Sequence, residues 1–481
     1  MLNSSLFINK KTQFEFLLLI QFILFSFVLW FYGELKIADF SLGGDGPSYL
    51  SFSFSSIEDI LSSHRTFGLP IILNLYKVFF SNLDMWPIWQ YIAYSSSVFY
   101  LYKSLVYAKF NKLSSFVITS ALIWNPTVAG GFKHPETEVF TAIFLILIFA
   151  TLLKFVQSKK DSSLAFLSFF IFYIYQIRPN MGFIVFLVPI WGFFISKLVT
   201  LDNSRVTLFI SLKLFAISFL PLLIFCTIRL FAVGDFGMAS FTGTVLSGHA
   251  TSYLNQEHIA KFDDESTKKL ASEILLRKNR ISNPCNKIND LTFEEQQYCG
   301  NTHIMISWLS AIKLINGREP FDDPVKNIEP WKYKNLSRFF SGNNIEIDNL
   351  LKKYSTRLLS LEKKLYLNST TKKYLEAFKT YFRTLFDHFI YLIGTLLIIL
   401  SFLLHKFYLS LNNIKISKKT IHGQNKEFIV LFVVSITLMI SGVLSTGLII
   451  HFDPRYLESF SLFFLSTILH LSIPVSFLRN K

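Results

Sequence analysis

The feature that most constrains this chain is a series of long apolar runs. A helix needs about 20 mostly apolar residues to cross the hydrocarbon core of a membrane. By that measure the sequence predicts about ten spans, at residues 13–32, 86–107, 114–127, 136–155, 164–177, 181–198, 206–231, 385–409, 428–451 and 458–477. The run at 67–80 is short and contains Lys77, so we expect an interfacial or re-entrant helix there. The predicted fold class is therefore an all-α polytopic membrane protein.

The composition agrees with this class. The 481 residues are 51% hydrophobic and only 16% charged, whereas soluble domains carry roughly 25% charged residues. The net charge of +15 does not indicate a nucleic-acid partner, because the basic residues form short clusters between apolar runs rather than one patch with interleaved aromatics. The run at 13–32 follows Lys10 and Lys11 and precedes no small-residue cleavage site, so we expect an uncleaved anchor.

The basic clusters predict the orientation, because cytoplasmic loops carry an excess of Lys and Arg. With ten spans, one side of the membrane would hold all of these residues: Lys10, Lys11, Lys103, Lys109, Lys112, Lys154, Lys159, Lys160, Lys197, Arg205, Lys406, Lys415, Lys418, Lys419, Lys426, Arg479 and Lys481. We therefore expect a multi-pass protein of the cell (inner) membrane with both termini in the cytoplasm.

One long polar segment, residues 232–382, falls on the opposite side. It is too long for a connector, and its stretches 266–279 and 347–367 have helical apolar spacing, so we expect a mostly helical extracytoplasmic domain. The chain then divides into an N-terminal transmembrane module (1–231, with a first outer loop at 33–85), this segment, and a C-terminal transmembrane module (383–481). The segment contains Cys285 and Cys299, whose pairing that compartment permits but the sequence leaves open.

Asp45 is the central acid of the first outer loop, in "SLGGDGPSYL". The simplest interpretation is a Gly-Asp-Gly-Pro turn in which the Asp side chain bonds its own backbone. The alternative is a general base just outside the membrane. Other ionisable groups at predicted span ends fall on the same outer side, and such residues are functional candidates.

Three arginines on that side sit beside prolines or turns: Arg65 in "RTFGLP", Arg178 in "IRPN" and Arg455 in "DPRY". Each alone is typical of an interfacial anchor, with Tyr456 in the aromatic belt. Together they are suited to gripping an anionic group such as phosphate.

A group of acids opens the fourth predicted span, in "HPETEVF". Glu136 and Glu138 complement a helix N-terminus, and Glu138 could instead form a second acidic centre facing Asp45. With His134 they make a loose set of divalent-metal ligands that defines no metal site. The sequence contains no Gly-rich phosphate loop, zinc pattern or nucleophile elbow.

Taken in order, these motifs resemble the GT-C superfamily of integral-membrane glycosyltransferases, near members related to protein O-mannosyltransferases and lipid A aminoarabinose transferases. The resemblance covers the first two hundred residues and the last thirty. The matching positions are Asp45 and Tyr49, Arg65, Asn125-Pro126, Glu138, Arg178-Pro179 and Arg455-Tyr456. This chain has Asp-Gly where many members have Asp-Glu, and 232–382 matches no known segment.

The resemblance implies a helical membrane domain with an extracytoplasmic cleft that uses polyprenyl-phosphate sugars, or in some branches diphosphate-linked ones. We expect transfer of a hexosyl or pentosyl group, with inversion, to a glycan, lipid or protein acceptor. The expected roles are catalytic for Asp45 and Glu138, phosphate-binding for Arg65, Arg178 and Arg455, and supporting for Tyr49, His134, Glu136 and Tyr456. No cofactor is identified, and a divalent metal ion stays an open alternative.

Two other classes share many spans. A glycan polymerase of the O-antigen type would use arginines of the large outer loop rather than acids at span ends. A transporter or flippase would place polar groups near the midplane and often contains repeated halves. In this chain the polar groups collect at one face and no repeat is visible, so the transferase is the favoured prediction.

Overall fold

The computed structural model describes residues 13–36, 45–125, 128, 130–280, 293–317, 344–368, 371, 421–449 and 462–472, and every regular element in them is a helix. The N-terminal helices are α1 (Gln13–Phe31), α2 (Gly46–Leu50), α3 (Ile57–Ser62), α4 (Gly68–Phe79), α5 (Trp86–Tyr107), α6 (Lys112–Ile123), α8 (Thr137–Ser158), α9 (Asp161–Ile177), η2 (Pro179–Phe183), α10 (Ile184–Ile195), η3 (Ser196–Thr200) and α11 (Ser204–Val233). The later helices are α12 (Thr242–Tyr253), α13 (Gln256–Ile259), α14 (Glu265–Asn279), α15 (Phe293–Asn316), α17 (Asn344–Leu361), α20 (Ile421–Ile449) and α22 (Phe464–Ser472).

The predicted all-α class is confirmed for this part of the chain. Within the described ranges, four helices are long and apolar enough to cross a membrane, namely α1, α8, α11 and the continuous stretch Pro179–Thr200. Helices α4, α6 and α9 are apolar but shorter. The count of ten spans stays a prediction, and the predicted span at 385–409 lies outside the described residues.

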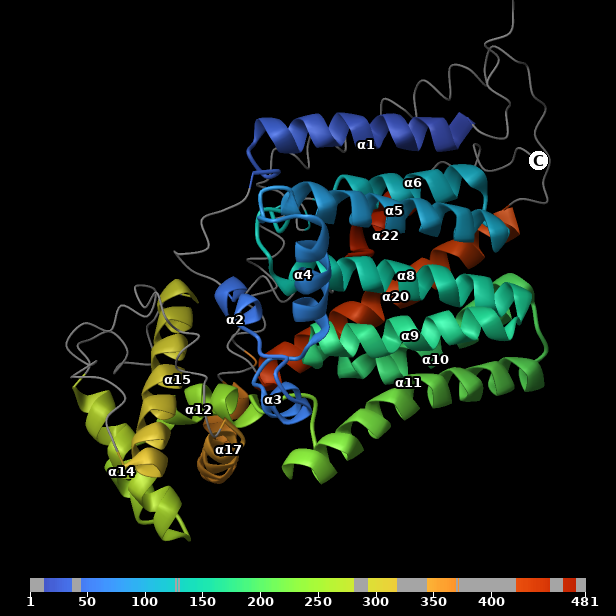
Figure 1. Ribbon diagram of the computed structural model, residues 1–481. Helices are drawn as coiled ribbons and strands as arrows, with labels where there is room; N and C mark the ends of the chain where they lie inside the picture. Colours follow the sequence, from blue (N-terminus) through green and yellow to red (C-terminus); the bar gives the residue numbers. More distant parts are fainter. Residues whose placement is uncertain are drawn as a thin grey trace, which may run out of the picture.

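The long helices run side by side as a bundle with α8 at its centre (Figure 1). Helix α8 is apolar on all sides, which is typical of a helix buried among others. In its most apolar stretch 83% of the residues are buried inside the protein, against 17% for α11. Helix α11 therefore exposes an apolar surface of the kind that faces lipid.

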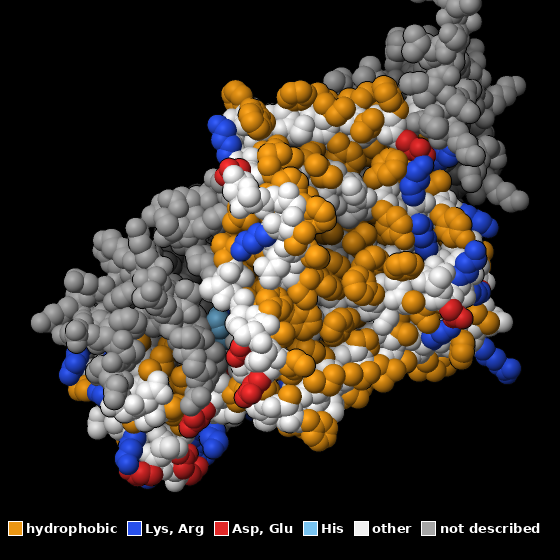
Figure 2. All heavy atoms as spheres, viewed as in Figure 1, with side chains coloured by type: hydrophobic (Ala, Val, Ile, Leu, Met, Phe, Trp, Pro, Cys, Tyr) orange, Lys and Arg blue, Asp and Glu red, His pale blue; other side chains and the backbone are white. Residues whose placement is uncertain are grey.

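The two ends of the bundle differ in charge. Figure 2 shows hydrophobic side chains along its flank and Lys and Arg side chains gathered at the end away from α14. Lys103 near the end of α5 and Lys159 after α8 belong to this basic end, with side chains 45% and 48% exposed. The loops that hold Asp45 and Arg178 lie at the other end. The orientation of the protein in a membrane stays a prediction.

Helix α4 crosses the bundle rather than running along it (Figure 1). Its inner face buries Leu69 and Leu73, while Val78 and Phe79 are 76% and 79% exposed. An amphipathic helix of this length cannot span a membrane and is suited to its interface. The short apolar helix predicted at 67–80 is thus present.

The C-terminal helices belong to the same hydrophobic core as the N-terminal module. Helix α20 packs against α10, and α22 packs against α6. The Trp191 indole donates a hydrogen bond to Thr437 Oγ1 (2.9 Å), and Ser466 Oγ donates to the carbonyl of Ile118 (3.0 Å). The described parts of the two predicted transmembrane modules therefore form one bundle.

A second, separate core holds together α12, α14, α15 and α17. Helix α12 lies at the centre of this core and packs against α15 and α17. Gly243 allows α12 to approach the backbone of α17 closely, because a Cβ at this position would lie 2.0 Å from the Asp348 carbonyl oxygen. The helices predicted at 266–279 and 347–367 are confirmed as α14 and α17 with its extension. Cys299 is disulfide-bonded and Cys226 is free, while Cys285, whose pairing with Cys299 the sequence left open, lies outside the described residues.

Candidate functional site

The candidate site lies at the end of the bundle that faces the second core. Asp45 directly precedes α2, and Arg65 lies in the turn between α3 and α4. Glu138 is in the first turn of α8, and Arg178 follows the last residue of α9. Four segments, two of them in the first outer loop, thus contribute one charged side chain each.

The first ion pair joins Asp45 Oδ1 to Arg65 Nη2. Arg65 also donates from Nε to Ser48 Oγ (3.0 Å) and from Nη1 to the Tyr49 hydroxyl (3.4 Å). Its guanidinium lies 4.9 Å from the centroid of the Tyr49 ring and 5.7 Å from that of Phe241, which places it between two aromatic faces. These contacts hold Arg65 in place, whereas the Asp45 side chain remains 44% exposed and is accessible to a ligand.

The backbone explains why Asp45 is held there. Its carbonyl accepts hydrogen bonds from the Ser48 amide (3.0 Å) and hydroxyl (2.6 Å), which starts the short helix α2. The turn interpretation is therefore right for the backbone. The carboxylate, however, reaches a partner twenty residues away.

The second ion pair is buried. Arg178 Nη2 lies 3.2 Å from Glu138 Oε1, and the two side chains are 5% and 14% exposed. The other carboxylate oxygen, Oε2 of Glu138, is buried without a hydrogen-bond partner. Breaking such a pair by removing one partner costs about 3–5 kcal/mol, because a buried charge is left uncompensated.

Tyr49 lies close to both pairs. Burial raises the pKa of its phenol well above the ordinary value, and Arg65, Asp45, Glu138 and Arg178 all act on it electrostatically. The phenol therefore stays protonated at neutral pH. An O–H group in this position can donate a hydrogen bond to an anion between the pairs.

A close backbone contact keeps the two arginine-bearing segments together. Gly68, the first residue of α4, packs so tightly on the end of α9 that a Cβ there would lie 2.4 Å from the Gln176 carbonyl oxygen. The Tyr173 hydroxyl of α9 also donates to the Gly68 carbonyl (3.0 Å). Only glycine allows this approach without displacement, which explains the Gly in "RTFGLP".

The remaining predicted site residues have different positions. His134 accepts a hydrogen bond at its backbone carbonyl from Gln90 Nε2 (3.1 Å), and Glu136 is the residue preceding α8, with no side-chain capping bond. Arg455 and Tyr456 lie outside the described residues, so their predicted roles stay predictions. Within the described ranges there is no group of three or more His, Cys, Asp and Glu side chains arranged to hold a metal ion.

The sequence motifs did not identify several residues that lie at the site. His64 lies beside Phe241, with ring centroids 6.0 Å apart, and burial followed by the charge of Arg65 lowers its pKa well below the usual value, so the imidazole is neutral. The amide atoms of Gln176 and Asn180 are buried and have no hydrogen-bond partner. Buried polar atoms are almost always paired with protein, water or ligand, so these two amides are candidates for binding a polar ligand.

The site thus combines an exposed carboxylate, two guanidinium groups, a protonated phenol and two unsatisfied amides. Such a set can take a proton, bind an anion and hydrogen-bond a polar molecule. No family model, curated protein or solved structure matches this chain, so its function is inferred from this geometry.

Proposed function

We propose that this protein is a membrane glycosyltransferase that moves a sugar from a polyprenyl-phosphate donor to an acceptor hydroxyl on the extracytoplasmic face. The observation that carries the proposal is the pairing of the exposed Asp45 with Arg65 beside the buried pair of Arg178 and Glu138. One carboxylate is accessible for proton transfer, and cationic groups lie close by for a phosphate.

The proposed reaction follows from these positions. The acceptor hydroxyl loses its proton to Asp45, and its oxygen attacks the anomeric carbon of the donor. The bond between that carbon and the phosphate oxygen breaks, and the phosphate keeps the electron pair. Arg65 and Arg178 stabilise the charge that develops there, with the Tyr49 hydroxyl as an additional donor. Attack opposite the leaving group inverts the anomeric configuration.

The lipid part of the donor also has a suitable surface. Helix α4 begins three residues after Arg65 and presents the exposed apolar side chains Leu75, Val78 and Phe79. A polyprenyl chain is apolar and would gain by lying against such a surface. The helix therefore supports a donor whose phosphate is at the membrane surface and whose tail is in the lipid.

The proposal is tested by Asp45→Asn, which preserves size and hydrogen bonding but removes the base. Donors are short-chain polyprenyl-phosphate hexoses and pentoses, supplied together with glycan, lipid and peptide acceptors that carry free hydroxyl groups. The wild-type protein in nanodiscs should transfer the sugar and release polyprenyl phosphate from at least one donor. Turnover of the variant should fall by roughly two to four orders of magnitude while donor binding stays near normal.

The matched control is Asp59→Asn, an exposed acid of α3 in the same outer loop. It should keep wild-type turnover. Full activity of the Asp45 variant would leave Asp45 as a structural residue, and no release from any donor by the wild-type protein would refute the proposed function.

A further inference from the structure

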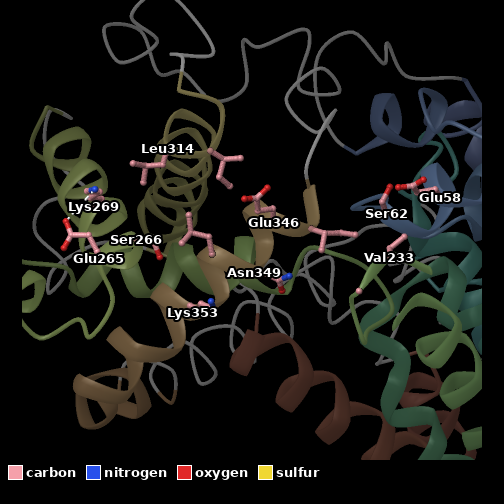
Figure 3. Close-up of a pocket in the computed structure, with 14 residues that line it drawn as sticks. Glu58, Ser62, Val233, Glu265, Ser266, Lys269, Leu314, Glu346, Asn349 and Lys353 are labelled. Atoms are coloured by element: carbon pink, nitrogen blue, oxygen red, sulfur yellow. Dashed lines mark ion pairs between the residues drawn. The ribbon is translucent and has the colours of Figure 1, made fainter. Parts of the chain in front are cut away.

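A large cavity lies beside the candidate site, between the bundle and the second core (Figure 3). Its volume is about 1080 Å³. Glu58 and Ser62 of α3 line one wall together with the end of α11, whereas the opposite wall comes from α14, α15 and α17. Ligand pockets usually measure about 300–1,000 Å³, so this cavity has room for an oligomer rather than a single small unit.

The cavity adjoins the site through α3. Ser62 lines the cavity, and Arg65 follows only three residues later. Three residues span at most about 11 Å even when fully extended, so the Cα atoms of Ser62 and Arg65 lie within that distance. A molecule that extends from the cavity past Ser62 therefore has at most about this distance to cover to Arg65.

The two elements of the wall nearest the site, α3 and the end of α11, are joined by a buried arginine. Arg229 near the end of α11 donates from Nε to the carbonyl of Leu61 in α3 (2.8 Å) and from Nη1 to that of Gly237 (2.6 Å). Gly237 lies in the connection that leads from α11 to α12. The cavity is thus bounded by fixed elements on the side nearest the site.

The chemistry of the lining favours a polyhydroxylated ligand. Glu58 and Glu346 approach from opposite walls as hydrogen-bond acceptors, and Asn349 and Lys353 add donors on α17 (Figure 3). Aliphatic residues such as Leu314 also line the cavity and can contact the C–H faces of sugar rings. Sugar hydroxyls both donate and accept, so they match a lining of mixed character.

A peptide fits this lining less well. Extended peptides commonly bind by adding a strand to a sheet edge, and the described residues contain no strand. Peptides that bind as helices require an apolar groove, whereas this lining mixes carboxylates, ammonium groups and aliphatic side chains.

We infer that the cavity binds a glycan acceptor and directs its terminal hydroxyl to Asp45. The inference rests on the proposed function and adds the acceptor class to it. The cavity orients the acceptor, and the ion pairs of the site bind the donor phosphate. Obstructing the cavity should therefore weaken acceptor binding and leave donor binding intact.

The experiment uses Asn349→Trp, which places a bulky side chain in the cavity from an exposed position of α17. Thr356→Trp is the matched control, because it is also exposed on α17 but lies seven residues, about 10 Å, further along the helix and does not line the cavity. The full-length proteins in nanodiscs are applied to an array of defined oligosaccharides and an array of peptides. Donor binding is measured separately with polyprenyl-phosphate sugars.

The wild-type protein and Thr356→Trp should bind a common subset of oligosaccharides, and Asn349→Trp should bind them at least tenfold more weakly with unchanged donor binding. Absence of oligosaccharide binding, binding of peptides alone, or equal oligosaccharide binding by Asn349→Trp would overturn the inference. Failure of the wild-type protein to use any donor would instead refute the proposed function, while the oligosaccharide array still decides what the cavity binds.

Discussion

Gly68→Ala tests whether the contact between α4 and α9 holds the two ion pairs together. The new Cβ would lie 2.4 Å from the Gln176 carbonyl oxygen and 2.8 Å from the Ile177 amide nitrogen. Ordinary van der Waals contact begins at 3.4 Å, so the two backbones must separate by 1.0 Å (3.4 − 2.4). The obstacle is backbone, which no side-chain rotation can relieve.

Overpacking of this kind costs about 1–3 kcal/mol. Gly68 is the first residue of α4, where the helix propensity of Ala recovers little of this cost, so we expect a net loss of about 1–3 kcal/mol in the free energy of unfolding. The displacement also moves Arg65 relative to Arg178. A misplacement of about 1 Å can reduce the rate by about a hundredfold, so transfer should fall by up to that factor.

The free energy is measured by equilibrium denaturation with SDS in mixed micelles, and transfer is measured by release of polyprenyl phosphate in nanodiscs. The control is Gly182→Ala, because Gly182 lies at the same end of the bundle in η2 and a Cβ there would meet nothing within 4 Å. It should match the wild-type protein in both assays. Wild-type stability and transfer in Gly68→Ala would refute the reasoning, as would equal losses in the two variants.

Three further outcomes are expected. With an impermeant maleimide on intact cells, a cysteine at Ser266 should react and one at Lys160 should react only after permeabilisation, and reaction of both from outside would contradict the predicted orientation. Denatured, unreduced protein should bind one thiol reagent per chain, at Cys226, and reduced protein three, whereas three without reductant would exclude the disulfide of Cys299. Hydrogen bonds from Ser266 and Thr267 lower the pKa of Asp264 from 3.8 to about 2, so its capping of α14 is fully present above pH 4 and is lost as the pH falls towards 2. Asp264→Ala should therefore destabilise the protein in thermal unfolding by about 1 kcal/mol at pH 7, and this loss should disappear as the pH approaches 2. A loss that persists at pH 2 would instead be assigned to packing.

The helical class and the surface helix α4 were predictable because they follow from the length and polarity of continuous runs. The interleaving of α20 and α22 with the N-terminal helices was not, since an apolar residue that faces lipid and one that faces a neighbouring helix look the same in a sequence. The packing of Trp191 on α20 is therefore visible only in three dimensions.

The candidate site was predictable to the same extent. Asp45 and Arg65 belong to one predicted outer loop, so counting spans places both on the same side of the membrane. Their pairing, however, depends on how α2 and α4 are arranged within that loop. Phe241 covers Arg65 from a segment whose sequence carries no recognisable motif. The open amide of Gln176 is recognisable only once its burial is known, because an Asn or Gln at a span end is usually hydrated.

The bond between Trp191 and Thr437 has a consequence for biosynthesis. The two residues are 246 positions apart, and ribosomes add about 5–20 residues per second. The partner of Trp191 is therefore made about 12–50 s after Trp191 itself. During that interval the face of α10 that later meets α20 must be shielded by lipid or by the insertion machinery. The membrane core is thus completed late in synthesis. Chains that terminate before α20 would be inserted in the membrane without a complete core, and membrane proteases would degrade them.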